Sequence, residues 1–487
     1  MATPPLSSFL WVIILFGFSG FLCPYAHEGR ETAESHRLLH THTVQVDSLI
    51  PSTTCTSTTA SNQGPKSKAS LKVIHKYGPC FQSKEDEVAA VPNHIEILLQ
   101  DQYRVNSIHS RLSKNSGSHK FRDSHAAILP VKDGLTLGSG NYIVTVGLGT
   151  PKRDLRLDFD TGSDLTWTQC QPCVGHCYNQ VDPIFNPSKS TSYSNNITCT
   201  SPTCTQLTSA SGNSPPVCSS TSQCIYTVGY GDGSYSIGYF SKERLTITSS
   251  DVLDNFLFGC GQDNQGLLNG SAGLLGLSRN KISIVQQAAQ KYGLFFSYCL
   301  PSTPSSTGHL TFGNNGGVSN TVKFTPLVTV SQDASFYGLG LTGISVGGRQ
   351  LSIPTSVFST PGTIIDSGST ITYLPPMAYN ELRQAIRESM RGYPLTSSDS
   401  IFDTCYDFSK NKSVLVPSIA FLFGGVSVDL DHAGVFYMLS SSQACLGFTG
   451  NSNASDIVIS GNTQQKRLEV VYDVAGGRIG FGPNGCS

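Results

Sequence analysis

One pattern occurs twice in the chain and constrains its fold more than any other feature. GNYIVTVGLGTP (140–151) alternates apolar and small residues into a glycine turn, and LDFDTGS (157–163) follows it. FYGLGLTGISVGG (336–348) shows a similar alternation, and TIIDSGST (363–370) follows it in turn. The order and texture of the two copies match, although their overall identity is low. An internal duplication of this kind predicts two similar lobes, each contributing one loop that carries a carboxylate.

Each loop places an aspartate in front of small residues that can hold it. Asp160 and Asp366 are each followed by a hydroxyl residue, a glycine and a serine. Hydroxyl groups fix a loop by hydrogen bonds, and a glycine lets its backbone approach the carboxylate and donate an N–H group. A single Asp-Thr-Gly is equally typical of an ordinary Asx turn, so the signal lies in the two matching copies. The expected supporting residues are Thr161, Gly162, Ser163, Ser367, Gly368 and Ser369.

The two carboxylates are predicted to form one site where the lobes meet. Like charges that close cannot both ionise easily, so the pair holds one proton over an acidic range. One oxygen then takes a proton from a water while the other acid donates to a carbonyl, which is hydrolysis without a covalent intermediate. Asp158 and Asp164 have no counterparts in the second copy, and we expect them to be solvated.

The composition agrees with a β protein of more than one folding unit. The chain has 487 residues, more than one hydrophobic core usually supports. Val, Ile, Thr, Tyr and Phe recur in short runs between turn residues, which predicts many short strands. Short helices are expected at 381–390 and 283–293. Charged residues make up 13% and the net charge is −1, so the composition indicates no nucleic-acid partner.

The apolar run FLWVIILFGFSGFL (9–22) predicts a signal peptide that ends near Ala26. The run is short for a membrane span and suits a signal core, although the residues before it contain no Lys or Arg. A membrane anchor is the less favoured alternative. Later runs are too short or too polar to span a bilayer, so we expect no membrane span in the mature protein.

Residues 27–125 are rich in Ser, Thr, Lys and His and look loosely structured. LKVIHKYGPC (71–80) predicts a strand and a turn, and 94–112 has apolar residues at helical spacing. Nine of the chain's 12 histidines lie in this region. One interpretation is a solvated linker. We favour a prosegment that masks a site and is shed at low pH, with protonation of the imidazoles as a possible trigger.

The cysteine count indicates an oxidising compartment. Of 15 cysteines, Cys23 lies in the signal segment, Cys55 and Cys80 precede residue 126, and 12 follow. An even number after the processing point suits six disulfides. In a cytosolic protein CQPCVGHC (170–177) would suggest zinc, but here the signal segment and the even count favour disulfides. No metal or cofactor is expected. Asn-X-Ser/Thr sequons predict glycosylation at Asn196, Asn269, Asn411 and Asn453.

With both loops in view, the chain resembles the pepsin-like aspartic proteases, specifically the plant nepenthesin-like branch, from about residue 140 to the C-terminus. DTGS at 160–163 and DSGS at 366–369 match the two catalytic loops. The resemblance implies an all-β, bilobal acid-protease fold, with a central cleft between two similar β lobes and a few short helices. It also implies Asp160 and Asp366 as the catalytic dyad. The expected division is a signal peptide (1–26), a propeptide (27–125), an N-terminal lobe (126–325) and a C-terminal lobe (326–487).

Further segments match the family pattern. Trp167 matches the aromatic residue that follows the first loop, and YGDGS (230–234) matches the flap hairpin, with Tyr230 closing over the substrate. LLG (274–276) fits the apolar-apolar-glycine segment beside the first loop. In its second copy, ISG (459–461), Ser460 replaces an apolar residue, which could loosen the packing behind Asp366 or be offset by local hydrogen bonds.

The resemblance also implies a disulfide framework, which spacing alone does not determine. The implied pairs are Cys170–Cys173, Cys177–Cys260, Cys199–Cys224, Cys204–Cys218, Cys299–Cys486 and Cys405–Cys445.

The favoured function is an aspartic endopeptidase, made as a zymogen, that cleaves polypeptides at acidic pH. Its expected partners are polypeptide substrates and its own propeptide as an intramolecular inhibitor, and we expect a monomer that is secreted to the apoplast or cell wall. The vacuole is an alternative compartment. A second interpretation is a catalytically weak or inactive extracellular binding or inhibitor protein on the same scaffold. A third, a chloroplast DNA-binding protease, is disfavoured by the near-neutral charge and the apolar N-terminus.

Overall fold

A computed structural model describes residues 40–56, 69–81, 93–114, 142–207, 217–230, 234–266, 268, 270–314, 317–330, 334–398 and 400–486. The chain divides into two units, Met1–Leu38 and Leu39–Ser487. The first unit, which contains the whole predicted signal peptide, lies outside the described residues, as do Asn269 and the predicted flap tip at 231–233. All described residues belong to the second unit.

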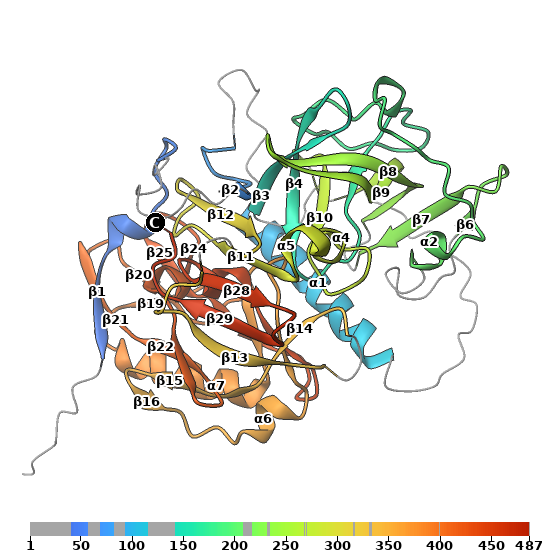
Figure 1. Ribbon diagram of the computed structural model, residues 1–487. Coiled ribbons are helices and arrows are strands. Elements are labelled where there is room, and N and C mark those ends of the chain that lie inside the picture. The colour runs from blue at the N-terminus through green and yellow to red at the C-terminus, as the bar shows by residue number, and fades with distance from the viewer. Residues whose placement is uncertain are drawn as a thin grey trace, which may run out of the picture. The chain divides into compact units, whose positions relative to one another are not determined.

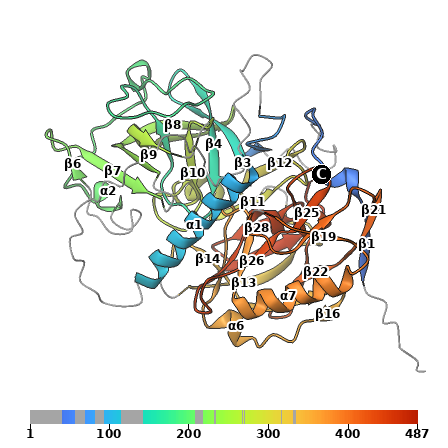
Figure 2. The same ribbon diagram turned by 180° about the vertical axis from the view of Figure 1, so that it is seen from behind.

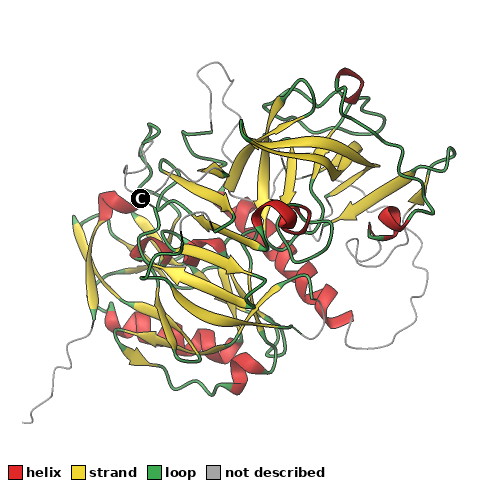
Figure 3. Ribbon diagram, in the orientation of Figure 1, coloured by secondary structure: helices red, strands yellow, loops and turns green. Residues whose placement is uncertain are grey.

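The second unit is built mainly from strands, as the sequence predicted (Figure 3). The N-terminal described segment contains β1 (Thr41–Gln45), η1 (Val46–Leu49), β2 (Ser70–His75) and α1 (His94–Lys114). The first half contains β3 (Tyr142–Leu148), β4 (Arg153–Asp160), β5 (Trp167–Gln169), η2 (Pro187–Lys189), α2 (Pro202–Thr205), β6 (Val217–Cys218), β7 (Cys224–Gly229), β8 (Tyr235–Thr248), β9 (Asp251–Gln265), β10 (Gly273–Gly276), α4 (Ile284–Gln287), α5 (Ala289–Tyr292), β11 (Phe295–Cys299) and β12 (Thr307–Phe312).

The second half repeats this texture. It contains β13 (Lys323–Val328), β14 (Tyr337–Leu339), β15 (Leu341–Val346), β16 (Arg349–Gln350), α6 (Ser356–Ser359), β17 (Thr363–Ile365), β18 (Thr372–Leu374), α7 (Pro376–Ser389), β19 (Leu395–Thr396), β20 (Cys405–Asp407), β21 (Ser413–Pro417), β22 (Ile419–Phe423), β23 (Val426–Asp429), η3 (His432–Gly434), β24 (Phe436–Met438), β25 (Gln443–Leu446), β26 (Phe448–Gly450), β27 (Val458–Ser460), η4 (Asn462–Gln465), β28 (Glu469–Asp473) and β29 (Arg478–Gly482).

A continuous sheet joins the two halves. Antiparallel pairing runs from β3 through β2, β12, β11, β28 and β29 to β13. The segment before residue 142 therefore supplies an internal strand, β2, between strands of the body. Its Leu71 and Val73 are buried in the main core, which makes β2 an integral part of the assembled sheet.

The described helices differ in how much apolar surface they bury. α7 begins at Pro376, a residue suited to the first turn, and buries Tyr379, Leu382 and Ile386 at helical spacing. The helix expected at 381–390 falls largely within α7. The helix expected at 283–293 is instead two single turns, α4 and α5, with Ser283 capping the first.

The described pieces of the segment before residue 142 are folded onto the body, whereas the sequence suggested a loose region. β1 pairs antiparallel with β21, and α1 lies between the strands of the two halves (Figures 1 and 2). Leu98, Val105 and Ile108 of α1 are buried against side chains of the second half. A disulfide, Cys55–Cys80, joins two pieces of this segment, a bridge that the sequence analysis left unassigned.

Four of the six implied disulfide pairs were wrong. The structure pairs Cys170 with Cys260 and Cys173 with Cys177. Parallel pairing of β5 with β9 brings Cys170 and Cys260 together, and both are buried, whereas Cys173 and its partner lie in an outer loop.

The second exchange has a similar cause. Cys204 bonds to Cys224, both being buried, and Cys199 bonds to Cys218 closer to the surface. The remaining pairs, Cys299–Cys486 and Cys405–Cys445, are as expected.

Candidate active site

The two aspartates emerge from equivalent places in the two halves. Asp160 ends β4, which pairs in parallel with β10, so that Gly276 lies opposite Asp160. Asp366 follows β17, which pairs in parallel with β27. LLG and ISG thus lie beside the two loops, where the family pattern predicted them. In each half, the glycine of that segment donates its N–H group to a threonine hydroxyl, Thr166 in the first and Thr372 in the second.

Each carboxylate is held by its own loop in the same manner. The Gly162 N–H donates to Asp160 Oδ1 at 2.8 Å, and the Ser163 hydroxyl donates to Oδ2. The Gly368 N–H donates to Asp366 Oδ1 at 3.3 Å, and the Ser369 hydroxyl donates to Oδ2 at 2.6 Å. These donors offset much of the free-energy cost of burying the carboxylates.

The loops are tied to each other by a reciprocal pair of hydrogen bonds. The Thr161 N–H donates to Ser367 Oγ at 3.0 Å, and the Ser367 N–H donates to Thr161 Oγ1 at 2.9 Å, across 206 positions of sequence. The hydroxyl residue after each aspartate therefore serves the opposite loop. This exchange places the two carboxylates side by side.

The loop glycines are required because each faces the other half's carboxylate. A Cβ at Gly162 would lie 2.7 Å from Asp366 Oδ1. A Cβ at Gly368 would lie 2.5 Å from Asp160 Oδ1. Any side chain at either position would displace a carboxylate.

Arg104 of α1 binds both carboxylates. Its Nη2 lies 2.8 Å from Asp160 Oδ1 and 2.9 Å from Asp366 Oδ2, and its Nε donates to Asp366 Oδ2 at 3.0 Å. Only 13% of the Arg104 side chain is exposed. The guanidinium therefore occupies the place between the carboxylates where a reacting group would have to lie. Sequence reasoning missed this residue, since helical spacing alone did not single out a polar position on α1.

The environment separates the two carboxyl pKa values. Burial works to raise the pKa of Asp160, but the Arg104 charge and the bonds from Ser163 and Gly162 outweigh it and hold that pKa below its usual range. Burial raises the pKa of Asp366, and the Asp160 charge adds to the rise, although Arg104 opposes it. With Arg104 bound, Asp160 is thus the stronger acid of the pair.

A second contact fixes α1 at the Asp366 loop. Asp101 accepts the N–H groups of Thr370 at 2.5 Å and Ile371 at 3.2 Å. Asp101 is fully buried, on the same face of α1 as Leu98 and Val105. Burial raises the pKa of Asp101 to about 7. The helix thus holds both the dyad and the loop behind it.

The predicted flap residues lie in contact. The Trp167 indole Nε1–H donates to the Tyr230 hydroxyl at 2.8 Å. Trp167 is buried beside the first loop, with 2% of its surface exposed. Tyr230 directly follows β7, where the hairpin begins. The structure thus places both aromatic residues on the Asp160 side of the site.

Asp158 and Asp164 are buried, so the expectation that they are solvated was wrong. β4 is paired on both edges, with β3 and β10, so it is an internal strand of the sheet. Asp158 pairs with Lys76 at 3.1 Å, with both side chains 1% exposed, and Asp164 accepts bonds from Ser278 and Asn280. Each carboxylate thus has partners that compensate for the loss of water.

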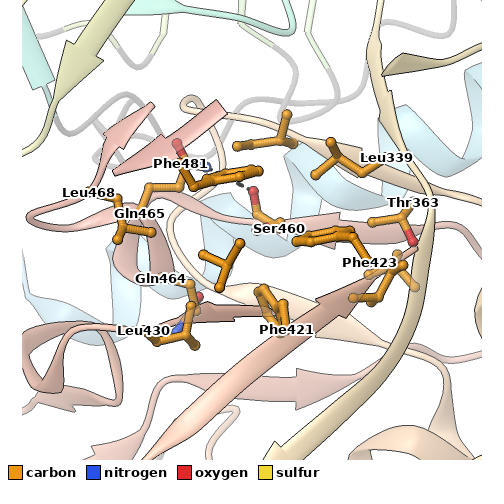
Figure 4. Close-up of a pocket in the computed structure, with 14 residues that line it drawn as sticks. Leu339, Thr363, Phe421, Phe423, Leu430, Ser460, Gln464, Gln465, Leu468 and Phe481 are labelled. Atoms are coloured by element: carbon orange, nitrogen blue, oxygen red, sulfur yellow. Dashed lines mark hydrogen bonds between the residues drawn. The ribbon is translucent and has the colours of Figure 1, made fainter. Parts of the chain in front are cut away.

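Ser460 keeps the second loop in place through its backbone. Its carbonyl accepts the Asp366 N–H at 3.0 Å and a Gln465 amide N–H at 3.0 Å. Its side chain lines a small cavity of about 20 Å³, surrounded mainly by apolar side chains such as Leu339 and Phe421 (Figure 4). The serine therefore leaves a little space in the core without breaking the contacts of the Asp366 loop.

Other predicted sites are placed as follows. Asn196 and Asn453 are exposed, and Asn411 is half-buried in a turn. Among the described residues no group of His, Cys, Asp and Glu has the arrangement of a metal site. No helix in the described ranges is long and apolar enough to cross a membrane.

Comparison with known proteins shows the family to which the chain belongs. Residues 142–314 match the family described as Xylanase inhibitor N-terminal, and residues 336–483 match Xylanase inhibitor C-terminal. An aspartyl protease family protein of Arabidopsis thaliana is 55% identical over 467 residues, covering 96% of this chain and 97% of its own. The aspartic proteinase nepenthesin-2 of Nepenthes gracilis is 36% identical over 392 residues, covering 79% of this chain and 83% of its own.

Solved structures share the fold at low identity. The crystal structure of edgp matches with a TM-score of 0.57 and 20% identity, covering 72% of this chain and 92% of that one. Basic 7S globulin from soybean matches with a TM-score of 0.56 and 20% identity, covering 71% and 91%.

Proposed function

The chain belongs to the plant aspartyl proteases, a branch of the pepsin-like family, and on that premise we propose that it is an endopeptidase active at acidic pH. The observation that carries the proposal is the Asp160–Asp366 pair, held by two symmetric loops and tied by the Thr161–Ser367 exchange. An inactive scaffold protein has no need of both carboxylates, both glycines and this alignment.

In the open enzyme the dyad holds one proton and binds the water that attacks the peptide. The ionised carboxyl takes a proton from the water. The protonated carboxyl donates its proton to the peptide carbonyl oxygen as the tetrahedral carbon forms. Proton return to the amide nitrogen then releases the two peptides. The Gly162 and Gly368 N–H groups hold the carboxylates in place throughout.

Two aromatic residues support the substrate side of this proposal. The Tyr230 hydroxyl accepts from Trp167, which orients the ring at the base of the hairpin. A flap there would cover an extended polypeptide bound by strand addition. No cofactor or metal takes part in these steps.

We propose further that the chain is made as a zymogen in which Arg104 and α1 close the site. The guanidinium neutralises both carboxylates and excludes water from between them. Cleavage between α1 and β3 and departure of the segment would free the dyad. The proposed division is therefore a signal peptide (1–26), a propeptide (27–125) and two lobes (126–325 and 326–487), in a secreted, glycosylated monomer. The seven disulfides support an oxidising route.

The test is acidification of the purified proform, followed by assay on an unfolded protein with and without pepstatin. Wild type should process itself and cleave, and pepstatin should block both. Asp160→Asn should remain a full-length, folded proform. Cleavage that persists in Asp160→Asn or resists pepstatin would refute the mechanism.

The alternative is a binding or inhibitor protein on the same fold. The family descriptions name xylanase inhibitors, and Ser460 departs from the apolar pattern beside Asp366. A proform that opens on acidification, yet cleaves no unfolded protein, would favour this alternative.

A further inference from the structure

A chain of buried side chains runs beneath the dyad and joins the two catalytic loops by a second route. Tyr298 of β11, Tyr472 of β28 and Gln465 of η4 are at most 2% exposed. They lie in the sheet that connects the halves, where β11 pairs with β28. Buried hydroxyl and amide groups cost free energy unless they are bonded, so their partners are informative.

The number of protons on each group fixes which partner donates in each hydrogen bond between these side chains. The Gln465 amide Nε2 donates to the carbonyls of Asp366 at 3.2 Å and Ser460 at 3.0 Å, so its Oε1 faces Tyr298 and accepts that hydroxyl. Tyr298 has then used its only proton, so in its 2.9 Å contact with Tyr472 it accepts.

Ring packing extends this network to the first loop. The Tyr298 ring contacts the ring of Phe159, the residue before Asp160, with centroids 5.6 Å apart. The network therefore reaches from the end of the strand that carries Asp160 to the main-chain carbonyl of Asp366.

Aromatic packing keeps the tyrosines in position. The Tyr472 ring stacks on Phe296 with centroids 4.3 Å apart and planes at 6°. Tyr337 contacts the Tyr472 ring at 69°, with centroids 4.6 Å apart. The hydroxyl of Tyr337 donates elsewhere, to the Leu277 carbonyl, so it is outside the chain. A rigid platform of this kind transmits the position of one loop to the other.

We propose that Tyr298, Tyr472 and Gln465 are positioning residues that set the separation and orientation of the two catalytic carboxylates. They touch neither substrate nor the reacting oxygens, and they act through Phe159 and the Asp366 backbone. The inference rests on the proposed protease function. It adds that the alignment of the dyad depends on this chain as well as on the Thr161–Ser367 exchange.

The first experiment uses Tyr298→Phe, which removes the middle hydroxyl and leaves the ring. Tyr406→Phe is the matched control, since Tyr406 is 1% exposed and its hydroxyl has no hydrogen-bond partner among the described residues. In the self-activated enzyme, Tyr298→Phe should lower kcat about 10-fold, as expected when a group that aligns reacting atoms is lost, with KM within about twofold. The pH limits of kcat should also shift, which a loss of stability alone would not produce. Tyr406→Phe should keep the wild-type kcat and pH profile.

The second experiment does not depend on catalysis. A proform that begins after residue 26 retains one of the chain's two tryptophans, Trp167, beside the first loop. Rapid acidification followed by Trp167 fluorescence reports the pH at which α1 releases the dyad. Misaligned carboxylates bind Arg104 less well, so Tyr298→Phe should open at a pH about 0.5 to 1 unit higher.

The two experiments separate the inference from the proposed function. A wild-type protein that does not cleave would refute the proposed protease function. The opening pH of Tyr298→Phe would then still test whether the buried tyrosines and Gln465 position the two carboxylates. A Tyr298→Phe variant that matches Tyr406→Phe in kcat, pH profile and opening pH would overturn the inference.

Discussion

At the scale of single residues, the site is a set of exchanges between two loops. Thr161 and Ser367 each donate a main-chain N–H group to the other's hydroxyl, and Gly162 and Gly368 each leave room for the other half's carboxylate. The repeated motif was enough to predict all of these residues, because the two loops obey one local pattern. Arg104 could not be predicted in this way, since nothing in the sequence near it repeats.

Arg104 yields the most specific prediction at this scale. Arg104→Gln removes the charge that binds both carboxylates, so the proform should open and process itself at a pH higher than wild type by about one unit or more. The sign follows from Asp160, whose lowered pKa means that its bond to Arg104 stabilises docking above its usual pKa of 3.8 and is lost as the pH falls further. The measurement is the midpoint pH of self-processing.

Arg111→Gln is the control for this prediction. Arg111 also lies on α1, but its guanidinium lies over the Phe336 ring at 4.5 Å rather than on the dyad. Its midpoint should move much less. Equal midpoints in both variants would show that Arg104 does not hold the site closed.

At the scale of elements, α1 and β2 decide how the N-terminal segment responds to pH. Both were predicted from local patterns, a helical stripe and a short alternating strand. Their docking was not predictable, because it depends on distant partners such as Thr370 for Asp101 and Asp158 for Lys76. The same reason explains the error about Asp158, whose alternating strand becomes an internal one only when its neighbours assemble.

Histidines and Asp101 respond to acid in opposite directions. Burial, with a smaller effect of Lys466, lowers the pKa of His75 to about 3. Between this pKa and the usual one, His75 therefore binds a proton in the released segment but not in the docked segment. Docking through His75 is therefore fully stable above about pH 6.5 and loses stability as the pH falls towards 3. The raised pKa of Asp101 works the other way, because the docked carboxyl gains its proton first.

His75→Phe tests this account at the β2 strand. A phenylalanine ring should keep the edge contact with Tyr142. Because it does not titrate, it should remove the loss of docking stability that His75 causes at low pH. We expect self-processing to require a pH lower by at least about half a unit. His176→Asn, in an exposed loop of the first half, is the control and should have no effect. A His75 variant with the wild-type profile would exclude His75 as a trigger.

At the scale of the whole molecule, disulfides and the joining sheet hold the two halves as one framework. The even number of cysteines was readable from the sequence, but the pairing was not, since it depends on which strands lie side by side. Cys299–Cys486 closes a loop of 187 positions, from β11 to the end of the chain, whereas Cys173–Cys177 closes only 4.

These loop lengths predict different losses of stability. Replacing Cys299 and Cys486 by serine should lower the free energy of unfolding by roughly 5 kcal/mol, and replacing Cys173 and Cys177 by roughly 2 kcal/mol. Thermal or denaturant unfolding of the two double variants measures the difference. Equal losses would mean that local strain rather than loop closure controls the stability.

The central claim is that two halves contribute one carboxylate each to a single catalytic unit. The most direct measurement is kcat/KM on an unfolded protein at acidic pH for Asp160→Asn, Asp366→Asn and the double variant, each with its propeptide removed by an added protease. Groups that act as a unit are non-additive, so each single variant should lose about 10³-fold or more, and the double variant should lose no more than either. Substantial activity in either single variant, or losses that multiply in the double variant, would contradict the account.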